Sequence, residues 1–382
     1  MKRWFLLLVV AVVFAVGTTA LAQETTQVEP WTCPEDVLNL ENKTLNFLNW
    51  ATYIAENTVP DFEAACGVKV TTDFYGSNEE LLARMRAGNP GFDLIVPSGY
   101  TVAEMIAEGL LEPLDKANIP NIKNISPDLL GRQFDPGNVY SLPYQWGTVG
   151  IGYNVKAVAA VLGEDVEITS WNQLFDYPVA RVGWLDDQRV MLGIGLLMLG
   201  YDPNSANPDE IREATDYLVE KGRKNVLRIA VDDGQELLAR GEVDMVIEYS
   251  GDIFQVALAC EEDPNCGTEY AYILPDEGAN MWIDNLVIPT RAQNKRLAEA
   301  FIDYVLHPQV GADISNYIAY ATPNQVSIDA GLIDEYLLES PIIYPTADVF
   351  ERLFVTEAFA DMPEVQQYYN DAWDELKIFV AR

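Results

Sequence analysis

The sequence predicts an α/β protein with two lobes, and three observations carry that prediction. The chain has 382 residues, of which 49% are hydrophobic, which is enough for two sizeable cores. From Thr44 onward, short apolar stretches alternate with amphipathic ones, a pattern typical of a parallel sheet with helices on both faces. The same alternation begins again at Thr148. We therefore expect two lobes, each a mostly parallel sheet flanked by helices.

The N-terminus resembles a secretory signal peptide. Lys2 and Arg3 precede the apolar run 4–16, and the small residues Ala20 and Ala22 form an A-x-A pattern, which predicts cleavage after Ala22. A membrane anchor is the alternative, but the run is short for a span. Residues 23–43 are polar and lack periodicity, so we expect an N-terminal arm. We expect a secreted protein, periplasmic or otherwise extracytoplasmic, without stable membrane insertion after cleavage.

The elements follow from periodicity and from helix-start signals. Ser77 and Glu80 form one expected capping box, and Ser170 and Gln173 form another. In the first half we expect strands at 44–48, 68–74 and 93–97, and helices at 56–66, 81–87 and 102–108. In the second half we expect strands at 148–154, 181–185, 227–231, 243–249 and 281–289, and helices at 190–199, 210–221, 295–306 and 364–380.

The net charge is strongly negative. Without residues 1–22 the chain keeps 22 Lys and Arg against 59 Asp and Glu, a formal charge of −37. Such a chain repels nucleic acid and anionic membranes and attracts cations. The four cysteines suit an exported protein with disulfides. Cys260 and Cys266 can close a short loop, which would leave Cys33 and Cys66 to pair, although four cysteines allow three pairings.

Aromatic and acidic residues recur at the ends of the expected strands, where open α/β sheets bind ligands. They include no Lys or Arg. Aromatic faces attract cations and cover methylene chains, and carboxylates form charge-assisted hydrogen bonds with amines. A single Trp or Tyr in such a place is usually packing, and a single Asp is usually a helix cap, so the recurrence carries the argument. The residues are Trp50, Tyr53, Ser98, Tyr100, Asp187, Tyr249, Asp252, Trp282, Asp284 and Tyr320.

Several motifs resemble, in order, those of the bacterial periplasmic spermidine/putrescine-binding proteins. They cover nearly the whole chain from Thr44 onward. The motifs are Asn49-Trp50-x-x-Tyr53, Tyr75-x-Ser77-Asn78-Glu79, the run 93–98, Phe134-Asp135-Pro136-x-Asn138-x-Tyr140 with Pro143-Tyr144-x-Trp146-Gly147, Trp282-x-Asp284, and Tyr320-x-Thr-Pro-Asn324.

The resemblance implies a type II periplasmic binding protein, whose two lobes close on a ligand about a hinge. It implies a polyamine ligand, putrescine or spermidine, an ABC permease as the partner, and a monomer. Lobe 1 would comprise residues 44–148 and 285–345, and lobe 2 would comprise residues 149–284 and 346–382.

The resemblance also assigns roles to the residues at the strand ends. Trp50, Tyr53, Tyr100, Tyr249, Trp282 and Tyr320 would form an aromatic box, with Ser98 as a polar contact. Asp187 and Asp284 would hold amines, and Asp252 matches an acid of the putrescine-specific branch.

This sequence departs from the family at three positions. Thr52 and Val190 stand where the family has acids, and Tyr249 stands where it commonly has Trp. Glu248 offers a substitute carboxylate, but strand alternation should turn it away from the side of Tyr249.

Other functions fit less well. The single histidine, His307, argues against a Ser-His-Asp triad, and no phosphate-loop, dinucleotide or zinc motif occurs, so neither a cofactor nor a metal is expected. Asp187 and Asp284 leave a carboxylate-dependent glycoside hydrolase as an alternative. The adjacent Tyr368 and Tyr369 leave a receptor for a metal ion or another small cation, although their helical setting favours packing.

Overall fold

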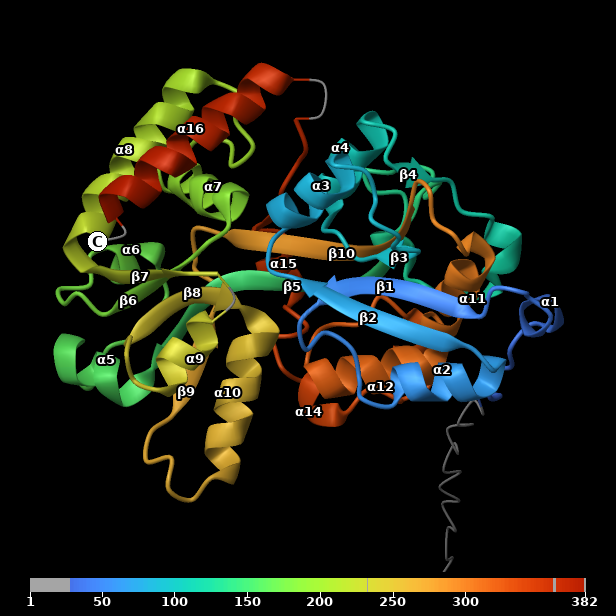
Figure 1. The fold of residues 1–382 in the computed structure, drawn as a ribbon. Coiled ribbons are helices and arrows are strands. Elements are labelled where there is room, and N and C mark those ends of the chain that lie inside the picture. Colours follow the sequence, from blue (N-terminus) through green and yellow to red (C-terminus); the bar gives the residue numbers. More distant parts are fainter. Residues whose placement is uncertain (1–27, 232, 360–361, 381–382) are drawn as a thin grey trace, which may run out of the picture.

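A computed structural model describes residues 28–231, 233–359 and 362–380. The expected signal peptide at residues 1–22 lies outside these residues. The chain forms two lobes, side by side, that share one long, curled sheet (Figure 1). Within the described residues, no helix combines the length and apolar character that crossing a membrane requires.

The sheet runs through both lobes in the strand order β2-β1-β3-β10-β5-β8-β6-β7. Three short strands join it at the side: β4 and β11 pair with β10, and β9 pairs with β5. The strands are β1 (Thr44–Trp50), β2 (Lys69–Tyr75), β3 (Leu94–Ile95), β4 (Leu111–Glu112), β5 (Ser141–Asn154), β6 (Val182–Leu185), β7 (Val226–Ala230), β8 (Met245–Tyr249), β9 (Tyr270–Ile273), β10 (Ala279–Pro289) and β11 (Leu353–Val355).

The two long strands β5 and β10 pass from one lobe to the other. They pair antiparallel with each other, from Asn280 opposite Val149 to Val287 opposite Ser141, with an irregularity between Asp284 and Asn285. In lobe 1, β10 also pairs with β3; in lobe 2, β5 pairs with β8 and β9. These strands are the main physical connection between the lobes.

Helices cover both faces of the sheet (Figure 1). In lobe 1, α11 and α12 pack on α2, and α3 packs on α4; in lobe 2, α16 packs along α8 and α7. The helices are α1 (Glu35–Leu38), α2 (Thr58–Cys66), α3 (Asn78–Arg86), α4 (Gly99–Ala107), α5 (Val155–Leu162), α6 (Trp171–Phe175), α7 (Gln188–Met198), α8 (Pro208–Asn225), α9 (Gly234–Ala239), α10 (Ser250–Glu262), α11 (Lys295–Val305), α12 (Pro308–Ile318), α13 (Gln325–Asp329), α14 (Glu335–Leu338), α15 (Ala347–Phe350) and α16 (Pro363–Val380).

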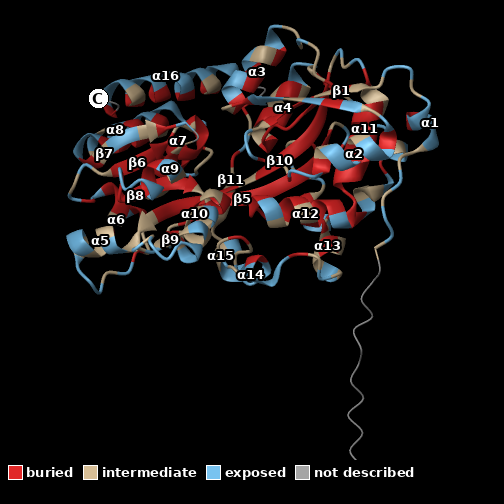
Figure 2. Ribbon diagram, turned by 60° about the horizontal axis from the view of Figure 1, so that its bottom comes forward, coloured by how far each residue is buried: buried red, intermediate tan, exposed pale blue. Residues whose placement is uncertain are grey.

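Each lobe buries apolar side chains on both faces of its half of the sheet. In lobe 1, Phe47 and Phe301 belong to the core on one face, and Leu48 belongs to the core on the other. In lobe 2, Trp184 and Val246 belong to separate cores in the same way. Figure 2 shows the buried residues concentrated in the sheet and on the helix faces turned toward it. This burial is what holds the strand ends at the cleft in place.

The described part of the N-terminal arm is docked on lobe 1. The Trp31 indole donates a hydrogen bond to Asp303 at 2.8 Å, and Cys33 forms a disulfide with Cys66. Cys260 pairs with Cys266. The expected disulfide pairing is therefore confirmed.

The architecture confirms the expected fold class and corrects some details. Each lobe keeps its parallel pairs, but β5 and β10 run antiparallel to their main neighbours. The expected strand at 148–154 begins earlier, at Ser141. The capping box at Ser170 is present. At Ser77 only half of the box forms, because the Glu80 carboxylate accepts from Gly76 N instead.

Candidate functional site

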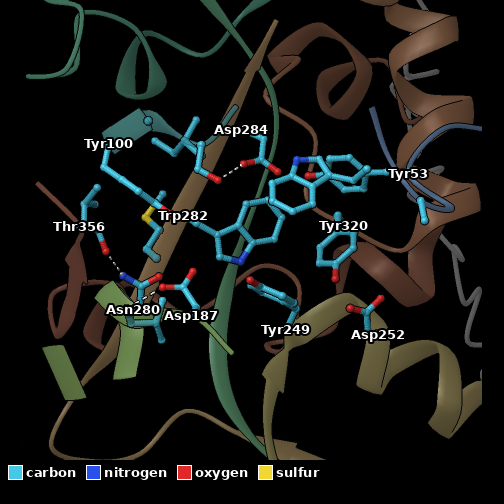
Figure 3. Close-up of a pocket in the computed structure, with 18 of the residues that line it drawn as sticks. Tyr53, Tyr100, Asp187, Tyr249, Asp252, Asn280, Trp282, Asp284, Tyr320 and Thr356 are labelled. Atoms are coloured by element: carbon cyan, nitrogen blue, oxygen red, sulfur yellow. Dashed lines mark hydrogen bonds between the residues drawn. The ribbon is translucent and has the colours of Figure 1, made fainter. Parts of the chain in front are cut away.

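A cavity of about 240 Å³ lies between the lobes. All ten residues selected from the sequence line it. Figure 3 shows that Asp187 and Tyr100 lie toward one side and Tyr53, Tyr320 and Asp252 toward the other, with Trp282 between them. Of the residues that line the cavity, none is Lys, Arg or His.

Four aromatic rings form a connected wall of the cavity. The Trp282 ring lies 5.1 Å from that of Tyr320 and 5.9 Å from that of Tyr249, and the Tyr53 ring lies 5.6 Å from that of Tyr320, all edge to face. Such contacts stabilise the ring positions in the absence of a ligand. Trp50 is fixed separately, because its indole donates to the Val96 carbonyl at 2.9 Å.

One strand supplies a full row of the site. Asn280, Trp282 and Asp284 alternate along β10 and line the cavity together, as the period-two rule predicts for Trp282 and Asp284. On β5, a Cβ at Gly147 would come within 2.5 Å of the Trp282 ring. Glycine at this position therefore lets the indole lie close to the neighbouring strand.

Asp284 is a buried carboxylate held by hydroxyl groups. It is only 5% exposed, and Ser98 Oγ donates to its Oδ1 at 2.6 Å. Asn78 Nδ2 in turn donates to Ser98 Oγ at 3.0 Å. Burial raises the pKa of Asp284 to about 7, opposed by the hydrogen-bonding hydroxyls of Ser98 and Tyr53. A cation in the cavity would stabilise the ionised form.

Asp187 is both a helix cap and a cavity residue. Its Oδ1 accepts from Val190 N at 2.9 Å at the start of α7. Burial raises its pKa, although these backbone hydrogen bonds and the charge of Arg189 act in the opposite direction. Arg189 is itself buried, with its guanidinium 4.2 Å from the Phe359 ring centre and 4.6 Å from that of Tyr369. The capping interpretation of Asp187 was thus correct, and it does not exclude exposure to the cavity.

Asp252 and Tyr320 meet at the other side of the cavity. Burial raises the pKa of Tyr320, and the adjacent carboxylate of Asp252 raises it further. Asp252 lies in the first turn of α10, and at Gly251 a Cβ would come within 2.7 Å of the Tyr320 ring. Glycine therefore permits the close approach of α10 to Tyr320.

Sequence reasoning missed several residues that line the cavity. Asn280 and Met281 directly precede Trp282 on β10, and alternation from Trp282 would have identified Asn280. Phe134 lies in a quoted motif but in an irregular segment. Ala51, Gly99 and Ile283 lie between selected residues in the strand-end segments, and Val231 ends an expected strand, but none of the four has an aromatic or acidic side chain. No strand-end signal marks the others, which are Gln235, Glu236, Gln255, Val355 and Thr356.

The positions that depart from the family pattern also face the cavity. Thr52 and Val190 line it, and Thr52 has a left-handed backbone with φ 51°, which is unusual for a β-branched residue. Glu248 does not line it. Its carboxylate accepts from Tyr249 N at 2.9 Å and lies beside Gly234 at the start of α9. The expectation that Glu248 points away from the side of Tyr249 fits this placement.

The paired tyrosines lie away from the cavity. The Tyr369 hydroxyl is buried and donates to the Ser205 carbonyl at 3.0 Å, whereas Tyr368 is on the exposed face of α16. Among the described residues, no group of three or more His, Cys, Asp or Glu side chains is arranged to hold a metal ion.

The chain has two lobes that share the strands β5 and β10, and a cavity lined by aromatic and acidic residues lies between them. This arrangement is typical of the two-lobed solute receptors. Residues 57–337 match the family model described as bacterial extracellular solute-binding protein. The chain therefore belongs to that family, whose members work outside the cytoplasm, and the expected extracytoplasmic location is confirmed.

Two curated relatives are similar to this chain over nearly their whole length. The chain is 35% identical to the putrescine-binding periplasmic protein PotF of Escherichia coli, with 98% of each chain covered. It is 35% identical to the putrescine-binding periplasmic protein SpuD of Pseudomonas aeruginosa, with 88% of this chain and 92% of the relative covered.

A solved structure is similar as well. The putative spermidine/putrescine ABC transporter protein of Listeria monocytogenes matches with a TM-score of 0.80 at 32% identity, covering 88% of this chain and all of that one. The resemblance found in the sequence motifs is thereby confirmed.

Proposed function

We propose that this protein captures a polyamine, putrescine or spermidine, between its two lobes and delivers it to an ABC permease. One observation carries the proposal: the cavity is lined by four carboxylates and a set of aromatic rings, and by no basic side chain. The carboxylates would pair with ammonium groups, and the rings would cover the methylene chain between them. The names of the relatives agree with this ligand class. The carboxylates are Asp187, Asp252 and Asp284, together with Glu236, which is largely exposed and also pairs with Arg240.

Isothermal titration calorimetry tests the ligand class. Putrescine and spermidine should bind, whereas butanol and glutamate should not. The first control has a short aliphatic chain without an ammonium group, and the second carries a net negative charge. Equal binding of butanol and putrescine would contradict the role of the carboxylates.

We further propose that the lobes close on the ligand, because each contributes to the cavity. Lobe 1 would comprise residues 44–148 and 285–345, and lobe 2 residues 149–284 and 346–382. The irregularity in β10 between Asp284 and Asn285 supports a boundary there. Small-angle scattering should give a smaller radius of gyration with saturating polyamine, and an unchanged radius would contradict closure.

We propose a receptor without catalytic activity, working as a monomer. Asp187 and Asp284 share the cavity, but Asp187 is occupied as a helix cap and Asp284 by Ser98. The competing glycoside hydrolase would release reducing sugar from oligosaccharides, and such turnover, abolished in Asp284→Asn, would favour it. Light scattering tests the monomer.

A further inference from the structure

Asn280 is a neutral polar residue that lines the cavity beside the aromatic and acidic ones. It is 1% exposed and lies two residues before Trp282 on β10. Side chains two residues apart on a strand point to the same face, so Asn280, Trp282 and Asp284 form one row. A side-chain amide that is buried this deeply is normally hydrogen-bonded, and its partners determine which of its two polar atoms a ligand meets.

The short strand β11 fixes the orientation of the Asn280 amide. Asn280 lies opposite Phe354 in the parallel pair of β10 and β11. Its Nδ2 donates to Thr356 Oγ1 at 3.0 Å and to the Phe354 carbonyl at 3.5 Å. Because a carbonyl oxygen can only accept, the amide nitrogen must face β11. The amide oxygen Oδ1 is therefore turned away from β11, and no described residue donates a hydrogen bond to it.

Asn280 lies on the side of the cavity where Asp187 lies. Helix α7, which Asp187 caps, packs against β10. Figure 3 shows Asn280 and Asp187 on one side of Trp282, and Asp252 on the other. Two hydrogen-bond acceptors, one from β10 and one from α7, thus share this side of the cavity.

The other polar and charged groups near Asp187 leave room for this acceptor. Val190, one turn beyond Asp187 on α7, lines the cavity with an apolar side chain. Glu236 also lines the cavity, but its side chain is 63% exposed and pairs with Arg240, so solvent screens its charge.

A neutral acceptor suits the place beside Asp187. An ammonium group has three N–H donors, whereas one oxygen of Asp187 already accepts from the backbone of α7. A second buried carboxylate would add an acceptor at the cost of repulsion between like charges. The carbonyl oxygen of an amide adds an acceptor without that repulsion, and its hydrogen bond to an ammonium group is charge-assisted.

We propose that Asn280 and Asp187 together bind the third ammonium group of a triamine, so that Asn280 sets the preference for spermidine over putrescine. This inference rests on the proposed function. The two ammonium groups of a diamine would pair with Asp284 and Asp252, whereas the additional group of a triamine would extend to the side of Asn280 (Figure 3). Thr356 is a positioning residue, which holds the amide with its oxygen toward the ligand.

The main test compares Asn280→Leu with Asn225→Leu in the mature protein. Asn225 is a matched control, because it is fully buried, donates to the carbonyls of Leu174 and Phe175 at 2.7 and 3.0 Å, and does not line the cavity. Calorimetry at pH 8 measures the affinity of each variant for putrescine and spermidine.

In Asn280→Leu, spermidine affinity should fall by about 10-fold or more, as expected for the loss of a hydrogen bond to a charged group. Putrescine affinity should change little, and retained putrescine binding shows that the variant folds. In Asn225→Leu, the ratio of the two affinities should equal that of the parent.

The role of Thr356 is tested by the same ratio. Thr356→Val removes the oxygen that holds the amide and should lower the preference for spermidine, whereas Thr356→Ser should restore it. In the Asn280→Leu background, Thr356→Val should lower the preference no further, because a positioning residue acts only through Asn280. If Asn280→Leu does not fold, Thr356→Val alone decides, and an unchanged ratio overturns the assignment.

The proposed function and this inference fail in different ways. If the parent binds neither polyamine, the proposed function is wrong. If the parent binds putrescine but not spermidine, or if Asn280→Leu weakens both ligands equally or weakens neither, the proposed function stands and the assignment of Asn280 is wrong.

Discussion

The strands β5 and β10 cross between the lobes side by side, yet they contribute to the site in opposite ways. β10 lines the cavity with five consecutive residues, from Asn280 to Asp284, whereas β5 lines it with none. β5 is buried from Ser141 to Gly152 and supports the site from behind. In the two strands that connect the lobes, therefore, β10 carries the side chains that line the cavity, and β5 leaves room for the Trp282 ring at Gly147.

The largest expected effect is that of Asp284→Asn on β10, the strand that lines the cavity. The change keeps the shape of the side chain and removes the charge that would hold an ammonium group in a buried cavity. We expect polyamine binding to lose roughly 2–5 kcal/mol, measured by calorimetry at pH 8. Folding should not suffer, because an ionised carboxylate without a cation is unfavourable in the empty cavity. A variant that binds like the parent, or that does not fold, would contradict this role for β10.

The pH dependence of the same carboxylate gives a second test. Its pKa of about 7 in the folded protein lies well above the usual aspartate pKa of about 4, so the folded protein holds an extra proton between these two pH values. The stability of the empty protein should therefore fall as pH rises from about 4 to 7, while polyamine affinity should rise toward pH 8. Thermal unfolding and calorimetry across this range measure the two trends. Both should be weaker in Asp284→Asn, and identical pH profiles for the two proteins would refute the assignment.

A change on β5 should act through shape. Gly147→Ala places a Cβ about 2.5 Å from the Trp282 ring, so the indole must move. Overpacking of this kind costs typically about 1–3 kcal/mol, and we expect a comparable loss in polyamine affinity, with altered indole fluorescence. Gly137→Ala, in an exposed loop where φ is not positive, serves as the control. Equal effects from both variants would mean that β5 does not shape the site.

The smallest expected effect also lies on β5. The Tyr144 hydroxyl donates to the backbone carbonyl of Tyr53 at 2.6 Å, and so supports the loop that carries a cavity residue. Tyr144→Phe should lower the free energy of unfolding by about 1 kcal/mol, with a smaller change in polyamine affinity. Chemical denaturation and calorimetry measure these quantities. A larger loss of binding than of stability would give β5 a more direct part in binding than we assign.

The strand-end rule located residues that line one cavity, because the rule depends on local sequence pattern. Trp50 and Tyr249 are the last residues of the apolar strands β1 and β8, Ser98 comes shortly after β3, and alternation linked Trp282 with Asp284. The rule could not find Phe134 or Thr356, because an irregular segment and the short strand β11 bring them to the cavity through contacts distant in sequence.

The helices and strands were predictable because they too depend on local sequence pattern, whereas the direction of the strands depends on contacts between distant segments. Periodicity revealed the alternating elements but not their direction, and so the antiparallel course of β5 and β10 was missed. Helix α10 was also missed, since its hydrophobic residues lack a clear stripe.

The crossing strands also bear on how the protein assembles. Ile95 pairs with Val287, and α8 packs against α16 at the far end of the chain. Each lobe therefore needs segments that are a hundred residues or more apart in the sequence to complete its sheet and its helix packing. Contacts of such long sequence separation slow folding. Neither lobe can therefore finish folding before the other as a template for it. The whole chain must avoid aggregation until it folds.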